Sequence, residues 1–135
     1  MPRVHLIDKN LRGIIFKEAD LSDAILDWTD LSDADLSYTD ARGIKLGEAI
    51  LHRVNFEGAD LSKAIFGQTT FKGANLIHTN LSEAILTEST FRGANLSYTN
   101  LRGASYFEIA RCQGAIFRET IMPDGSIRSG RHYYA

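Results

Sequence analysis

The sequence predicts an all-β fold, a parallel β-helix with four sides and five to six coils. A repeat of five residues covers residues 4–119, and similar segments return at spacings that are multiples of 20. A chain of 135 residues with 44% hydrophobic residues is long enough to bury a core and has the size of one compact domain. We therefore expect a single solenoid rather than two domains.

The strands are predicted by two restricted positions in each repeat. Of the central positions taken at every fifth residue from Leu6 to Leu101, 14 are Leu, five are Phe and one is Ala41. Two places earlier, nine residues are Ala, five are Thr, and Lys9 alone is charged. Two restricted positions separated by a polar one alternate as in a short strand. An α-helix would turn by about 500° per repeat, so its apolar stripe would drift around the helix.

The size of a coil follows from similarity between repeats. Residues 70–76 match residues 90–96 at a spacing of 20, and residues 21–26 resemble residues 81–86 at a spacing of 60. These spacings indicate four repeats in each coil, with neighbouring coils about 4.8 Å apart. Each repeat then supplies three extended residues and a corner of two residues, with the Leu or Phe pointing to the axis.

Several segments carry a family consensus. Residues 19–23, 59–63 and 94–98 read ADLSD, ADLSK and ANLSY, which match the pattern A(D/N)LXX. The chain therefore resembles the pentapeptide-repeat family over most of its length. The resemblance implies a right-handed quadrilateral β-helix, in agreement with the count of four repeats per coil. Its small size and the ending at residues 121–127 are similar to cyanobacterial members.

The two ends are expected to differ. We expect residues 1–119 to form the β-helix and residues 120–135 to form a C-terminal cap and a short tail. Pro123, Asp124 and Gly125 suit a tight turn, and the residues on either side of it predict a hairpin. Ile121, Met122 and Ile127 would cover the last coil. Residues 128–135 read as a loosely packed terminus, with a docking tail as the alternative, and no helical cap is expected at either end.

Two departures from the repeat predict local changes. Ala41 leaves room where the other repeats place Leu or Phe, so residues 41–47 are expected to be irregular, with Ile44 filling the space. The repeat slips by one residue at 104–106, which predicts a bulge that turns Tyr106 outward.

Charge and composition exclude several classes of function. Fifteen Lys and Arg face 17 Asp and Glu, so a net charge of −2 gives no general attraction for nucleic acid or anionic lipid. The single cysteine, Cys112, excludes an internal disulfide and a thiolate zinc cluster, and its central position predicts an inert core thiol. Neither a signal-like run nor a long apolar stretch typical of a membrane span is present. We expect a cytoplasmic protein that does not bind membranes.

The sequence predicts no enzyme. The four histidines fall in different columns, so no pair has the spacing of metal ligands, and no serine is followed by a histidine and an acid in a catalytic arrangement. The glycines are single turn residues rather than a phosphate-binding loop. We therefore expect no catalytic residue, no cofactor, no metal and no small-molecule substrate.

Residues 20 apart stack into outward columns, and three of these are expected to be structural or solvated. Asp at 20, 40 and 60 and Asn at 80 and 100 could hold a cation, but the same types recur in the consensus, which favours a structural role. A column with Arg12, Lys72 and Arg92 is the best feature for nucleic acid, although a solvated face is favoured over it. A column with Tyr38, His78 and Tyr98 is a sparse partner surface.

A fourth column predicts a contact with protein. It places Ile25, Ile65 and Ile85 where the consensus has Asp or Asn, and Trp28 lies near its start. An exposed apolar stripe commonly marks a contact surface, whereas the alternative reading is that β-branched residues only improve the strand. The candidate contact residues are therefore Ile25, Trp28, Ile65 and Ile85, and the partner is another protein or a second copy of the chain.

Three functional hypotheses follow. The leading one is a rigid, non-catalytic scaffold that binds protein. The second is a regulator of DNA gyrase or topoisomerase that imitates DNA, as the resemblance implies for some family members, although a net charge of −2 and a short rod count against it. The third is a structural element without a specific partner.

Overall fold

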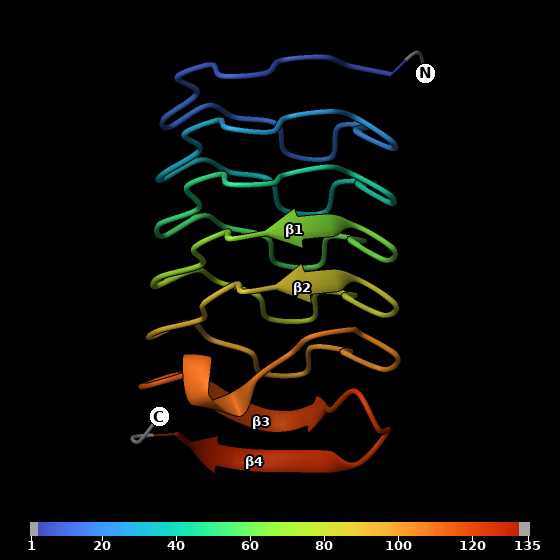
Figure 1. The fold of residues 1–135 in the computed structure, drawn as a ribbon, viewed down its shortest axis with the longest axis vertical. Helices are drawn as coiled ribbons and strands as arrows, with labels where there is room; N and C mark the ends of the chain where they lie inside the picture. The colour runs from blue at the N-terminus through green and yellow to red at the C-terminus, as the bar shows by residue number, and fades with distance from the viewer. Residues whose placement is uncertain (1–2, 133–135) are drawn as a thin grey trace.

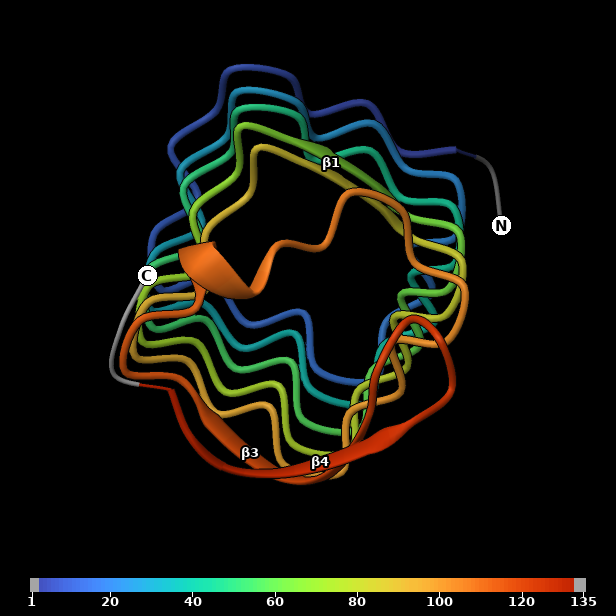
Figure 2. The same ribbon diagram turned by 60° about the horizontal axis from the view of Figure 1, so that its bottom comes forward.

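The computed structural model describes residues 3–132, which form a right-handed quadrilateral β-helix. The coils stack along one axis in Figure 1, and Figure 2 shows their four-sided outline from the C-terminal end. Two short strands, β1 (Ile65–Gly67) and β2 (Ile85–Thr87), lie on one side. A 3-10 helix, η1 (Ile109–Arg111), and two longer strands, β3 (Ile116–Ile121) and β4 (Ile127–Arg131), complete the C-terminal end.

Hydrogen bonds between neighbouring coils confirm four repeats per coil. The amide of Ile25 donates to the carbonyl of Val4 in the coil before it at 2.7 Å, and the amide of Leu26 donates to Lys45 in the coil after it at 2.8 Å. All four sides have parallel pairs of residues 20 apart, and β1 pairs with β2 through Ile65 and Ile85. Each coil is hydrogen-bonded through its backbone to the coil before it and to the coil after it. To keep both sets of bonds, each coil must return to the same point after four repeats.

The corners turn through a left-handed residue. The second corner residue has a positive φ whether or not it is glycine, for example 63° at Asp33 and 68° at Gly43. Most corners are closed by a hydrogen bond such as that from the Ala34 amide to the Leu31 carbonyl, at 2.9 Å. The positive φ is that of the third residue of a type II turn, and it costs a non-glycine residue about 1–2 kcal/mol. The inter-coil bonds and the core offset this cost.

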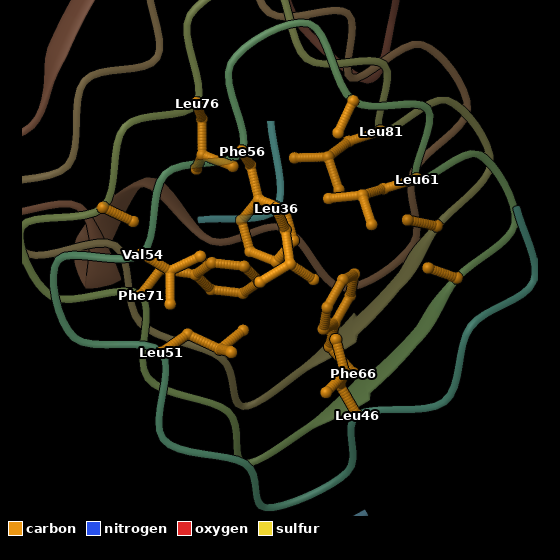
Figure 3. Close-up of a cluster of buried hydrophobic side chains, with 14 of the residues drawn as sticks. Leu36, Leu46, Leu51, Val54, Phe56, Leu61, Phe66, Phe71, Leu76 and Leu81 are labelled. Carbon is orange, nitrogen blue, oxygen red and sulfur yellow. The ribbon is translucent and has the colours of Figure 1, made fainter. Parts of the chain in front are cut away.

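The core fills the axis of the rod with Leu and Phe side chains. Phe56, Phe66 and Phe71 are fully buried and point toward one another in Figure 3. The rings of Phe66 and Phe71 lie 4.9 Å apart edge to face, and those of Phe71 and Phe91 stack at 4.6 Å. The small residues two places earlier are buried beside them, as the size of the side chains predicts.

The prediction of an irregular backbone at residues 41–47 is wrong. The amide of Ala41 donates to Asp60 at 2.8 Å, and Lys45 pairs with both Ile25 and Ile65, as in a regular coil. Ala41 and Ile44 are both fully buried. The side chain of Ile44 replaces the volume that Ala41 lacks, so the backbone keeps its course.

The predicted slip near Tyr106 is confirmed. Tyr106 has a φ of 62° and is 65% exposed. Beyond it the spacing between paired residues is 21 instead of 20, since Asn95 pairs with Ile116 and Asn100 with Ile121. Within the described residues, 106–110 make no backbone hydrogen bond to the neighbouring coil. The ladder resumes at Arg111, whose carbonyl accepts a hydrogen bond from the amide of Phe91 at 2.8 Å.

The C-terminal end differs in part from what the sequence indicated. β3 and β4 form an antiparallel hairpin in which Thr120 pairs with Arg128, and they run along one side of the coils (Figure 2). The expected absence of a helical cap is wrong, because η1 lies at this end. The expected covering role of Ile127 is also wrong, since its side chain is 62% exposed. Phe107 packs there instead, with its ring 5.5 Å from that of Phe91.

The tail is more ordered than expected. Residues 128–131 belong to β4, and the amide of His132 donates to the carbonyl of Ala115 at 3.0 Å. The prediction of a loosely packed terminus is therefore wrong for residues 128–132. Tyr133 and Tyr134 lie outside the described residues. β3 runs without a break through residue 120, so the division between residues 1–119 and 120–135 stays a prediction.

The Asp and Asn columns support the corners. The Oδ1 atom of Asp60 accepts a hydrogen bond from the amide of Ser62 at 3.0 Å, and that of Asn80 does the same for Ser82 at 2.9 Å. Asp and Asn serve equally, so this position requires an oxygen acceptor rather than a charge. Hydrogen bonds from the hydroxyl and the amide of Ser37 lower the pKa of Asp35 below its ordinary value.

We expect the substitution Ala41→Leu to destabilise the protein, although Leu is the common residue at this position. Ile44 already fills the space, so the added volume should cost about 1–3 kcal/mol of unfolding free energy. The double variant Ala41→Leu with Ile44→Ala should recover most of that loss. Urea denaturation measures both, and a double variant no more stable than Ala41→Leu would contradict the packing account.

We expect acid to weaken the corners. The pKa of Asp35 is lower in the folded than in the unfolded chain, so its contribution is complete above the unfolded value of about 3.9 and is lost as the pH falls toward the folded pKa. Asp35→Asn keeps the oxygen acceptor, as Asn55 and Asn75 do in the same column. This variant should lose less unfolding free energy than the wild type between pH 7 and pH 3. An equal loss in urea titrations would refute the assignment.

Candidate functional site

One side of the rod carries a row of outward side chains that we call the isoleucine ridge, made of Ile25, Lys45, Ile65 and Ile85. Parallel pairing joins each of them to the next, so the side chains follow the rod axis at the spacing of the coils. Ile65 is 40% exposed and Ile85 is 37% exposed, whereas Ile25 is half-buried. The predicted column is therefore a continuous row, and its exposed apolar surface is interrupted by one cation.

A groove of about 370 Å³ runs along one flank of this ridge. We call it the Trp28 groove. The ridge residues Lys45 and Ile65 form one wall, and the backbone of Gly47 and Gly67 forms the floor. The opposite wall and the end of the groove are made by corner residues of successive coils, namely Asp27, Trp28, Glu48, Gln68, Thr87 and Glu88. Its charged side chains are thus three acids and Lys45.

Trp28 is the largest side chain on this surface. It is 58% exposed and occupies a corner position with a φ of 65°. The equivalent corner residues in the next coils are Glu48, Gln68 and Glu88, which are polar. Positive φ is common to this corner position, as Tyr38 and Tyr98 also show. An indole left in water, however, forgoes the stabilisation that burial would bring. Nothing in the fold requires tryptophan at this corner.

A second groove lies on the other flank of the ridge. It measures about 600 Å³, and we call it the Arg42 groove. The ridge residues Lys45 and Ile65 line it together with polar corner residues, which are Ser22, Asp23, Arg42, Gly43, Ser62 and Lys63. Arg42 forms an ion pair with Asp40 at 2.7 Å. The ridge therefore stands between two grooves of different character, one acidic and aromatic, the other polar with more basic residues.

The tyrosine column is occupied by its own neighbours. The hydroxyl of Tyr38 donates to Oε2 of Glu57 at 2.8 Å, and its ring lies so close to Gly58 that an added Cβ there would collide with it. The rings of His78 and Tyr98 stack at 4.8 Å. These side chains are engaged within the rod, which weakens the case for a partner surface there.

The basic column is partly neutralised by carboxylates. Arg12 lies 3.3 Å from Asp30 and 3.7 Å from Asp33, and Arg53 binds Asp33 at 2.7 Å. Asp33 therefore joins two guanidinium groups, and the pKa of its carboxyl is lowered by the hydrogen bond from Arg53. A track for phosphates is not continuous along these coils.

The side chains that carry chemistry elsewhere do not assemble here. Burial raises the pKa of the Cys112 thiol to about 12, which disfavours the reactive thiolate. Within residues 3–132 no three His, Cys, Asp or Glu side chains come together as metal ligands. Across the same residues, no helix has the length and apolar character needed to cross a membrane.

Part of the site was not predicted from the sequence. Ile25, Trp28, Ile65 and Ile85 do lie on one side, but the floor and acidic wall of the Trp28 groove were not predicted. The signal was present in the corner columns. Written at a spacing of 20, they read Asp27, Gly47, Gly67, Thr87 for the first corner residue and Trp28, Glu48, Gln68, Glu88 for the second.

Two solved structures resemble this fold. Rfr23, a pentapeptide repeat protein from the cyanobacterium Cyanothece 51142, is 26% identical, covers 86% of this chain and 86% of its own, and gives a TM-score of 0.73. HetL, a pentapeptide repeat protein of Nostoc sp. strain PCC 7120 involved in heterocyst differentiation regulation, is 25% identical over 95% of this chain and 82% of its own, with a TM-score of 0.56.

A more distant structure is QnrB1, a plasmid-mediated fluoroquinolone resistance protein. It is 16% identical over 89% of this chain and 71% of its own, and its TM-score of 0.40 is too low to support a comparison of function. A search of curated proteins gave no match.

The repeat itself identifies the family. A family model of pentapeptide repeats matches eight copies, over residues 3–33, 29–68 and 69–105. These segments are the ones that build the stacked coils and their corner turns. The chain belongs to the pentapeptide-repeat family.

Proposed function

We propose that this protein is a non-catalytic scaffold that binds a protein chain through the isoleucine ridge and the Trp28 groove. The observation that carries the proposal is the exposed indole of Trp28 at a corner where the fold asks for no aromatic residue. Tryptophan is enriched among the residues that supply most of the binding energy at protein interfaces. The adjacent Ile65 and Ile85 extend the apolar area along two more coils.

The rigidity of the rod supports this proposal. The backbone N–H and C=O groups of Ile25, Lys45 and Ile65 bond to the coil before each of them, and those of their chain neighbours bond to the coil after, so the ridge is held in place before a partner arrives. A surface that is already ordered loses little conformational entropy on binding. Ile and Trp side chains also lose less rotamer freedom than long polar ones.

The similar structures are consistent with this proposal. HetL is described as involved in the regulation of heterocyst differentiation, a role that fits a binding protein, and both it and Rfr23 come from cyanobacteria. We extend the proposal to a cyanobacterial source and a cytoplasmic location, where a buried free thiol such as Cys112 is stable.

The alternative of a gyrase regulator that imitates DNA has less support. It needs a dense row of carboxylates, whereas the column of Asp20, Asp40 and Asp60 continues with Asn80 and Asn100. Arg42 is paired with one of these acids at 2.7 Å. With a net charge of −2, the rod does not reproduce the charge of a DNA backbone.

We expect Trp28→Gln to abolish capture of the partner without loss of stability. Glutamine stands at the equivalent corner as Gln68, so the variant changes the surface and keeps the turn. The measurement uses wild-type and variant proteins as parallel baits in a cyanobacterial lysate, with quantitative mass spectrometry of the retained proteins. The thermal midpoint of each bait is measured beside it.

The matched control is Tyr38→Gln, which removes an aromatic residue from a corner on another side of the rod. It should retain the same proteins as the wild type. If Trp28→Gln retains them as well, or if the control loses them equally, the ridge and groove are not the binding surface.

A further inference from the structure

We propose that the Trp28 groove receives the isoleucine ridge of a second copy, so that two rods associate side by side with their axes parallel. This inference rests on the proposed function and names the partner. Three features support it: the shape of the surface, a glycine at residue 67 that the corner turn does not require, and the charges that the pairing would bring together.

The shape of the surface favours a parallel pair. A two-fold axis parallel to the rods keeps each coil at its own height and exchanges the flanks of the ridge, so each ridge enters the other copy's Trp28 groove. A two-fold axis across the rods would instead place ridge against ridge and leave both grooves empty. An interface of this kind is self-complementary, because the same patch serves both copies.

The floor of the groove is made by two unusual glycines. Nine of the eleven glycines have a positive φ, which is the reason for glycine at a corner. Gly47 and Gly67 do not, and both line the groove in adjacent coils. Gly47 has a local reason for being glycine, because its amide donates to Oδ1 of Asp27 at 2.9 Å and an added Cβ would lie 3.4 Å from that oxygen. A Cβ added to Gly67 would meet nothing within 4 Å. The fold does not need glycine at Gly67, so the missing side chain leaves space for something seated above it.

The rows of the two surfaces match at each height. In the parallel pair, Ile65 of one copy lies over Gly67 of the other. Lys45 lies beside Glu48 and near the Asp27 carboxylate that accepts a hydrogen bond from the amide of Gly47. Lys45 is the one charged residue of the ridge, and the groove that receives it contains three acids, Asp27, Glu48 and Glu88, against one cation, its own Lys45. Ile25 reaches the height of the exposed Trp28. Apolar residues therefore meet apolar or open positions, and the cation meets acids.

The first test is the oligomeric state of the full chain by sedimentation equilibrium. We expect the wild type to show a concentration-dependent dimer. Gly67→Thr should weaken this dimer at least tenfold, because its side chain fills the floor, and should keep the wild-type thermal midpoint, since Thr87 occupies the equivalent position one coil on. A wild type that stays monomeric at millimolar concentration, or a dimer that Gly67→Thr leaves unchanged, would overturn the inference.

A charge exchange tests the orientation. Lys45→Glu and Glu48→Lys should each weaken the homodimer at least tenfold, because like charges then face each other at the same height. Mixed together, the two variants should form a heterodimer of near wild-type affinity, since the two acids of one copy would then face the two lysines of the other. A mixture that remains monomeric, or single variants that dimerise like the wild type, would refute the parallel arrangement.

These results separate the inference from the proposed function. A monomeric wild type that still captures a protein in a manner dependent on Trp28 would overturn the second copy as partner and leave the scaffold role intact. A dimer sensitive to both kinds of substitution would support the inference whatever else the lysate yields.

Discussion

The closure of each coil after four repeats is the constraint on which the rest of this structure depends. The amide of Ile25 bonds to the coil before it and that of Leu26 to the coil after it, so one residue too many on any side would break both ladders. Corners must therefore turn in two residues, which imposes the left-handed conformation, and at many corners an Asp or Asn side chain accepts a hydrogen bond from the corner amide. Where an extra residue occurs, the chain leaves the ladder at Tyr106 and rejoins it at Arg111.

This constraint acts inward and leaves the outer surface free to vary. Leu or Phe fills the axis because each closed coil encloses a fixed interior volume. The side-chain volume that is missing at Ala41 is supplied by its neighbour Ile44. The outward positions meet solvent, so their residues report on function more than on folding. On the side of the isoleucine ridge these positions combine exposed Ile65, the indole of Trp28 and Gly67, and we propose that this surface binds another chain.

Much of the fold could be predicted from the sequence, because the period of five and the spacing of 20 express the closure directly. The regular backbone beside Ala41 could not, since it depends on how completely Ile44 restores the volume of one layer. η1 and β4 lie outside the repeat, where no period guides the prediction. The grooves were missed for a different reason. Gly47 and Gly67 stand at the first corner position instead of the second, where the positive φ falls, and this difference shows only when the corner columns are written out at a spacing of 20.

We propose that two molecules of this protein associate through one face of the rigid β-helix. Amide chemical shifts followed over a concentration series test this proposal most directly. The account predicts that signals from residues 25–28, 45–48, 65–68 and 85–88 shift together as concentration rises, while Asn55 and Asn75 on another side keep their positions. Shifts confined to β4 or to the first coil, or spread evenly over all four sides, would contradict it.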